Sequence, residues 1–180
     1  MEHRRTITSR LLCVLLLATL LLVPRPATAA DEVIDRVLAV VDGELITLSD
    51  VRAAIELGRV QAGTAPDPPR VVLSQLIDRV LVLSEVDRFA PPEPSALTLD
   101  AAAEAVAARF PSPEAFDATL KRLGIDQPFV RELLREDLRI RAYLDQRFTA
   151  ASDRRQTLVD EWMAGLRRRA DVIDLYVSPR

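Results

Sequence analysis

The sequence predicts a mainly α-helical protein of about six helices with one small antiparallel sheet. Segments with helical spacing of apolar residues are separated by proline, glycine and capping residues. Two short segments rich in β-branched residues lie near the two ends, at 33–47 and 172–177. Such distant strands normally pair in a small domain, because an isolated hairpin is marginally stable and an open sheet edge is a liability. Residues 30–180 are therefore expected to form one domain, closed by the pairing of its N-terminal and C-terminal strands.

The first 29 residues have the layout of a cleavable secretory signal. Arginines at positions 4, 5 and 10 precede an unbroken apolar run from Leu11 to Val23, and Ala27-Thr28-Ala29 follow. The run is shorter than the roughly 20 residues that span a bilayer. A basic region, a short apolar core and an A-x-A site predict export with cleavage after Ala29. The expected location is the periplasm, and the alternative is an inner-membrane anchor formed by the uncleaved segment.

Cleavage would remove the single histidine, His3, and the single cysteine, Cys13. Residues 30–180 would then contain no imidazole and no thiol. This excludes Ser-His-Asp and Cys-His catalytic sites, zinc sites built from Cys and His, and disulfides. We therefore expect no catalytic residue, no metal site and no cofactor.

The charge of the chain argues against binding to nucleic acid. The chain has 24 Lys and Arg against 27 Asp and Glu, and a formal net charge of −3. The signal segment contains four arginines and one glutamate, so the remainder is more acidic. Arginines alternate with acids, as at Arg135-Glu136-Asp137, which is typical of solvated helix surfaces. The sequence shows no basic stripe for phosphates and no nucleotide-binding loop, so neither nucleic acid nor nucleotide is an expected partner.

A hairpin and a helix open the predicted domain. Val33 to Val41 is apolar and β-branched, and Glu44 to Thr47 resumes an apolar pattern after Asp42-Gly43. An Asp-Gly pair between apolar runs is a strong hairpin signal, because glycine accepts the positive φ of a tight turn. Ser49-Asp50 is predicted to start the first helix, which extends to about Gln61.

The second helix, over 71–89, is predicted to lie at the centre of the core. Apolar residues cover most of its circumference, which indicates contact with neighbours on several sides. The breaker segment Gly63–Pro69 precedes it. The prolines of the segment 90–94 end it, because proline cannot continue the hydrogen-bond ladder of a helix.

Two shorter helices are predicted next. The third, over 99–110, is alanine-rich and has Thr98 as its expected N-cap. The fourth runs from Pro113 to Leu123. Ser112 is its expected N-cap and Gly124 lies just past its end, the usual asymmetry of helix termini.

A long fifth helix is predicted from Gln127 to about Phe148, capped by Asp126. Asp137 and Arg141 interrupt its apolar face at i, i+4 spacing and are expected to pair. A short polar joint, 149–154, leads to a last helix that ends near Arg169. The strand at 172–177 follows and is expected to pair with the first hairpin.

Several of these segments resemble the SurA family of periplasmic chaperones. The similar segments are Val33–Val51, Leu76–Leu83, Phe116–Gly124, Val130–Arg147 and Trp162–Val172. The resemblance implies a helical chaperone module in which the N- and C-terminal segments pair. Family members usually carry parvulin-type prolyl isomerase domains between the long helix and the last helix, where this chain has only the joint at 149–154. Because the parvulin site resembles one built around paired histidines, we do not expect isomerase activity.

The resemblance implies an ATP-independent holdase that binds unfolded outer-membrane or exported polypeptides. Phe110, Phe116 and Phe129 lie beside helix boundaries and are the predicted client contacts, with core packing as the alternative for each. Trp162 is expected to anchor the core. The alternative function is that of a non-enzymatic adaptor or assembly subunit of an envelope complex, which an exposed apolar patch would serve equally well.

Overall fold

The computed structural model describes residues 35–60, 63–149 and 151–178. The chain divides into two units, 1–34 and 35–180, and all of the described residues belong to the second. The predicted signal segment, its cleavage site and the start of the predicted first strand at 33–34 lie outside the described residues.

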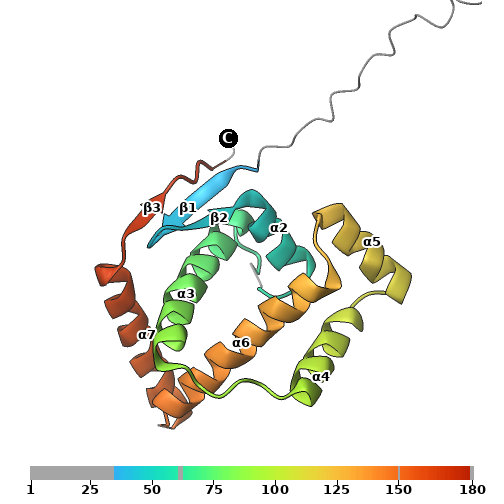
Figure 1. Cartoon of the computed structure of the whole chain (residues 1–180). Coiled ribbons are helices and arrows are strands. Elements are labelled where there is room, and N and C mark those ends of the chain that lie inside the picture. Colours follow the sequence, from blue (N-terminus) through green and yellow to red (C-terminus); the bar gives the residue numbers. More distant parts are fainter. Residues whose placement is uncertain (1–34, 61–62, 150, 179–180) are drawn as a thin grey trace, which may run out of the picture. The chain divides into compact units, whose positions relative to one another are not determined.

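The fold is mainly α-helical with a small antiparallel sheet, as predicted (Figure 1). The described part contains six helices and three strands. In chain order they are β1 (Val37–Val41), β2 (Glu44–Thr47), α2 (Leu48–Glu56), α3 (Pro68–Phe89), α4 (Ala96–Ala107), α5 (Pro113–Leu123), α6 (Gln127–Arg147), α7 (Ser152–Arg169) and β3 (Val172–Asp174).

The sheet has the strand order β2-β1-β3, so the predicted pairing of the two ends of the domain is confirmed. Val40 lies opposite Leu45 of β2 and Ile173 of β3, and both pairings are antiparallel. Asp42 and Gly43 form the hairpin turn with φ of 49° and 91°, as a tight turn that matches strand twist requires. Asp42 also joins the turn to the start of β3, because its carboxylate accepts the Asp171 N–H at 2.9 Å.

β3 is shorter than the predicted strand at 172–177. The Asp174 carboxylate accepts the Tyr176 N–H at 3.0 Å, which uses a donor that a longer strand would offer to a neighbour. The Tyr176 hydroxyl donates to Asp67 at 2.6 Å, so the last described residues follow the start of α3. This hydrogen bond lowers the pKa of Asp67 below its ordinary value.

Several helices begin or end away from their predicted boundaries. α2 begins at Leu48, one residue before the predicted start at Ser49, and is capped by Thr47, which forms a capping box with Asp50. It stops at Glu56 instead of extending to Gln61, because the chain turns at Gly58 with φ of 62°. Three further starts differ: α3 begins at Pro68 after the cap Asp67, α4 at Ala96 after Ser95 in place of Thr98, and α7 at Ser152 inside the predicted joint. α4 also ends at Ala107, three residues before the predicted Phe110.

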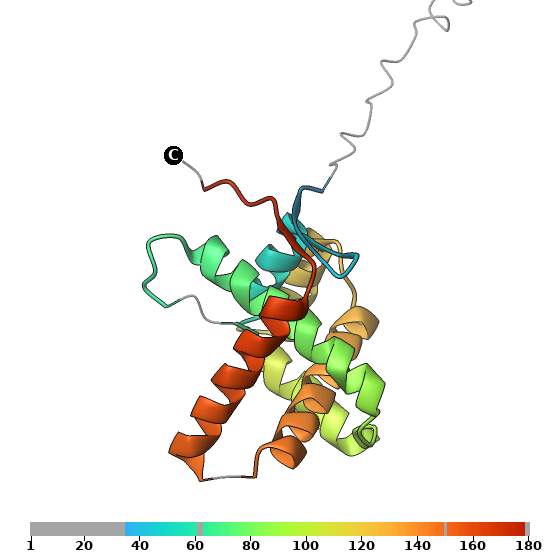
Figure 2. The same cartoon turned by 90° about the vertical axis from the view of Figure 1, so that its left-hand side faces the viewer.

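Two apolar clusters form the interior. The first surrounds α3, whose Val72, Leu73 and Val86 are fully buried, and it includes the inner side chains of the sheet. This confirms the predicted central place of the second helix. α7 packs alongside α3 (Figure 2), where the Arg167 guanidinium binds Asp78 at 2.5 Å.

The second apolar cluster joins α4, α5 and the first half of α6 to the end of α2. Its buried members are Leu57, Leu99, Val106, Phe116, Leu120, Val130 and Leu134. Arg109 ties this cluster to α2, since its guanidinium donates to the Leu57 and Gly58 carbonyls at 3.1 and 2.6 Å. The helices α4 and α5 and the first half of α6 therefore share a core of their own, and the candidate site lies among these helices.

One residue at a helix end should limit stability. Ala90 caps α3 with φ of 42°, in the left-handed region that disfavours a Cβ atom. Ala90→Gly should therefore stabilise the protein by about 0.5–1 kcal/mol, measured as a higher midpoint of urea unfolding. Gly124 caps α5 in the same conformation, so Gly124→Ala should lower the midpoint. Midpoints that move in the same direction would contradict this account.

Candidate functional site

An apolar groove of about 470 Å³ lies between α4, α5 and the first turns of α6. We call it the α4–α5 groove. Its apolar lining consists of Ala103, Ala107, Ala108, Phe110, Pro111, Pro113, Phe116 and Val130. Its size is within the range of small ligand sites, and its lining suits an apolar side chain.

Two of the predicted contact residues meet in this groove. The rings of Phe110 and Phe116 lie with their centroids 5.2 Å apart and their planes tilted by 51°. Phe116 is 7% exposed and belongs to the second core, whereas Phe110 is half-buried. Tilted aromatic pairs at this distance are favourable, so the pair forms a fixed aromatic wall.

Local sequence explains why Phe110 stands at the groove. α4 ends at Ala107, and the Phe110 N–H donates to the Ala107 carbonyl at 3.1 Å, which turns the chain. Ser112 then caps α5 and Pro113 occupies its first turn. The alanines of α4 leave room beneath the two rings. The alanine-rich composition of this stretch is the signal in the sequence from which the floor of the groove could have been predicted.

The rim of the groove is polar. Gln127 donates to the Asp117 carboxylate at 2.9 Å, and Arg131 of α6 pairs with Asp100 of α4 at 2.7 Å. Glu104 also lines the groove and is exposed. An apolar floor inside a polar rim is the usual anatomy of a polypeptide-binding surface.

Phe129 does not join the other two phenylalanines. It lies at the start of α6, is 43% exposed, and lines a separate hollow beside β2. Along an α-helix, adjacent residues point in directions about 100° apart, so Phe129 faces a different way from Val130, which lines the groove.

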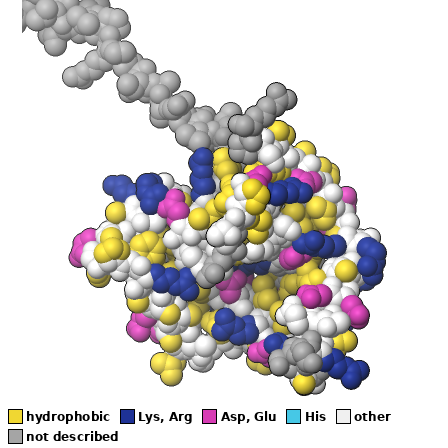
Figure 3. Space-filling model, turned by 180° about the vertical axis from the view of Figure 1, so that it is seen from behind, with side chains coloured by type: hydrophobic (Ala, Val, Ile, Leu, Met, Phe, Trp, Pro, Cys, Tyr) yellow, Lys and Arg dark blue, Asp and Glu magenta, His cyan; other side chains and the backbone are white. Residues whose placement is uncertain are grey.

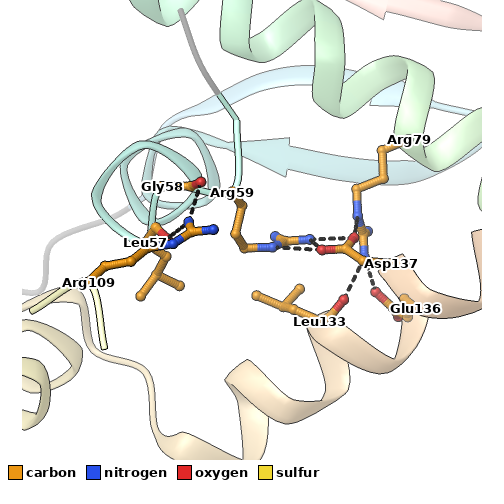
Figure 4. A network of polar contacts seen from close by, with 8 residues as sticks. All are labelled: Leu57, Gly58, Arg59, Arg79, Arg109, Leu133, Glu136 and Asp137. Atoms are coloured by element: carbon orange, nitrogen blue, oxygen red, sulfur yellow. Dashed lines mark hydrogen bonds and ion pairs between the residues drawn. The ribbon is translucent and has the colours of Figure 1, made fainter. Parts of the chain in front are cut away.

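A network of ion pairs joins α6 to α3 and to the turn that follows α2. The Nε and Nη2 atoms of Arg59 both donate to the Asp137 carboxylate, and the shortest of these contacts is 2.7 Å. Arg79 binds Asp137 at 2.9 Å and Glu136 at 2.5 Å. Figure 4 shows both guanidinium groups converging on Asp137. The Arg59 and Arg79 side chains are only 9% and 17% exposed, so these are partly buried charges whose mutual compensation matters.

This network corrects two predictions. Asp137 was expected to pair with Arg141, and Glu136-Asp137 were expected to be solvated surface charge. Asp137 instead binds Arg59 and Arg79, which come from distant parts of the chain. Burial lowers the pKa of Arg79, but its hydrogen bond to Glu136 and the charge of Asp137 outweigh burial, and the pKa is raised.

Elsewhere on the surface, acidic and basic side chains are interspersed with apolar ones, as on the face in Figure 3. Trp162 is half-buried and packs with Tyr143 and Phe148, at centroid distances of 6.0 and 5.5 Å, against the first core. Within the described residues, no three or more His, Cys, Asp or Glu side chains are grouped to hold a metal ion. Nor does that part of the chain contain a helix long and apolar enough to cross a membrane.

Comparison with known proteins gives weak likenesses to solved structures alone. No family model matches the chain, and no curated protein matches it. One matching solved structure comes from work on PEB4 and the periplasmic protein Cj1289 of Campylobacter jejuni, described as two structurally related SurA-like chaperones. The match has 22% identity and a TM-score of 0.36, and it covers 65% of this chain and 44% of the solved chain.

Proposed function

We propose that this protein is a periplasmic, ATP-independent chaperone that holds unfolded polypeptides by their apolar side chains in the α4–α5 groove. The observation that carries the proposal is the groove itself, in which the half-buried Phe110 ring and exposed Ala108 face solvent inside a polar rim, with the buried Phe116 ring behind them. The resemblance of the sequence segments to SurA-type chaperones supports the same function. Release needs no nucleotide, because binding through one small apolar groove is of moderate affinity.

The first experiment is suppression of aggregation. The purified protein, at several-fold excess, should delay the aggregation of several unrelated unfolded outer-membrane β-barrel proteins. A prolyl isomerase assay on the same preparation should show no activity. Lack of suppression, together with stoichiometric copurification of one partner, would overturn the proposal in favour of an adaptor subunit.

Variants in the groove should weaken client binding without unfolding the protein. Phe110 is half-buried, and Phe110→Ala should lower the affinity for an unfolded client by about tenfold, as truncation of an aromatic contact residue typically does. Ala108 is exposed in the groove, and Ala108→Glu should have a similar effect because an apolar segment would then bury a carboxylate.

The matched control is Ala142→Glu, which adds the same charge at an exposed position of α6 outside the groove lining. It should leave affinity within about twofold of the wild type. Circular dichroism and urea midpoints establish that each variant is folded. Equal losses of client affinity from Ala108→Glu and Ala142→Glu would show that the α4–α5 groove is not the binding site.

A further inference from the structure

A second hollow, of about 230 Å³, lies between β2 and the first half of α6. We call it the β2–α6 hollow. Leu45 and Phe129 line it from different elements and are 57% and 43% exposed. The rest of its apolar lining consists of Ile46, Ala53, Leu76, Val80 and Leu133. None of these residues lines the α4–α5 groove, so the two sites are separate.

β2 offers this hollow a strand edge. In the sheet order β2-β1-β3, β2 pairs with β1 only, so its other side has no strand neighbour among the described residues. The Thr47 N–H is used by the capping box with Asp50. This leaves the stretch around Leu45, in the middle of β2, for pairing with a bound chain. An extended segment can lie along this edge, and the side chains of that segment would then lie over the hollow.

The charges around the hollow are not balanced. Three carboxylates line it, those of Glu44, Asp50 and Glu136. Asp50 is held by Thr47, and Glu136 is paired with Arg79. The Glu44 carboxylate has no hydrogen bond or ion pair with another described residue. Burial and the nearby charge of Glu136 raise its pKa, and the charge of Arg79 offsets only part of that rise, so an added cation would be favoured beside Glu44.

The two arginines that line the hollow do not supply this cation. Arg59 is bound to Asp137, and Arg79 is shared between Asp137 and Glu136. Both guanidinium groups are thus committed to the network between α3 and α6 (Figure 4). Neither arginine forms an ion pair with Glu44, so a cation that pairs with its carboxylate would come from a bound partner.

We infer that the β2–α6 hollow binds an extended polypeptide segment in which an apolar side chain, held between Leu45 and Phe129, is followed by a lysine or arginine that pairs with Glu44. The inference rests on the proposed function, because its occupant is a stretch of unfolded chain. It adds a second contact point with a charge preference that the α4–α5 groove does not have. Two separate contacts on one chain would also raise the affinity for long clients above that for short ones.

The test compares two dye-labelled peptides, GSGLVKGSG and GSGLVEGSG, by fluorescence anisotropy at low ionic strength. Wild-type protein should bind the lysine peptide about fivefold more tightly, as an exposed ion pair allows. One molar salt should abolish the preference, because it shortens the screening length to about 3 Å. Glu44→Gln should reduce the preference to less than about twofold. Phe129→Ala should weaken both peptides and keep their ratio.

Matched controls use residues outside the hollow. Glu104→Gln removes an exposed carboxylate at the α4–α5 groove, and Leu97→Ala removes a side chain that is 80% exposed on α4. Both should preserve the fivefold preference. The inference is overturned if neither peptide binds, or if Glu44→Gln leaves the preference unchanged. If the inference is overturned but the protein still suppresses aggregation in a way that depends on Phe110, the proposed function stands. If the protein does not suppress aggregation either, the inference and the proposed function both fail.

Discussion

Asp137→Ala is expected to lower the free energy of unfolding by about 2–4 kcal/mol. Asp137 is the shared partner of Arg59 and Arg79, so its removal leaves two guanidinium groups in a largely buried place with only Glu136 to compensate them. Breaking a buried ion pair typically costs about 3–5 kcal/mol. The lower range applies here because the Asp137 side chain is 34% exposed and water can reach part of the network.

Urea unfolding measures this effect, and Asp145→Ala is its matched control. Asp145 lies on α6, as Asp137 does, and pairs with Arg155 of α7 at 2.5 Å. Its side chain is 59% exposed, so its loss should cost no more than about 1 kcal/mol. Asp137→Asn should fall between the two, because the amide keeps an oxygen acceptor but loses the charge. Equal midpoints for Asp137→Ala and Asp145→Ala would show that the network does not hold α3 against α6.

Phe116→Ala is expected to cost about 3 kcal/mol. The ring is buried in the second core, where it contacts Phe110, and large-to-small changes of buried aromatic residues cost about 3–5 kcal/mol. The lower end applies because one side of the site is open to the α4–α5 groove and water can fill the space left. The same substitution should also weaken client binding, since it removes half of the aromatic wall.

Hydrogen exchange locates the effect of Phe116→Ala. Protection should fall most in α4 and α5 and least in α3, because the second core is built from its own set of side chains. Leu73→Ala, in the fully buried centre of α3, is the comparison and should lower protection throughout the domain. Uniform loss of protection in Phe116→Ala would mean that the two clusters unfold as one unit.

The sequence predicted the architecture well where local chemistry decides it. Asp42-Gly43 requires positive φ at a tight turn, and Ser112, Pro113 and Gly124 mark both ends of α5, so the hairpin turn and that helix are in their predicted places. The first strand, β1, begins only at Val37, and residues 35–36 of the predicted strand are not in a strand. Helix starts were misplaced where another capping residue stood nearby. Thr47 and Ser95 cap α2 and α4, whereas Ser49 was the predicted start of the first helix and Thr98 the predicted cap of the third.

Long-range contacts were less accessible to prediction. The pair Arg59–Asp137 joins residues 78 positions apart, and neither residue carries a local signal of the other. The i, i+4 rule favoured Arg141 as the partner, but a guanidinium group from a neighbouring element reaches Asp137 with two nitrogens, which is the stronger geometry. The phenylalanines show the same limit, since only packing decides that Phe110 and Phe116 share a groove and that Phe129 lies outside it.

Site-specific photo-crosslinking to an unfolded client tests the central claim most directly. A photoreactive amino acid would replace Ala108, exposed in the α4–α5 groove, or Ala142, exposed on α6 outside the groove lining. The account predicts strong crosslinks to an unfolded β-barrel protein from position 108, weak ones from 142, and competition by unlabelled client. Crosslinks of equal yield from both positions, or stronger ones from 142, would contradict the claim that the groove holds unfolded polypeptides.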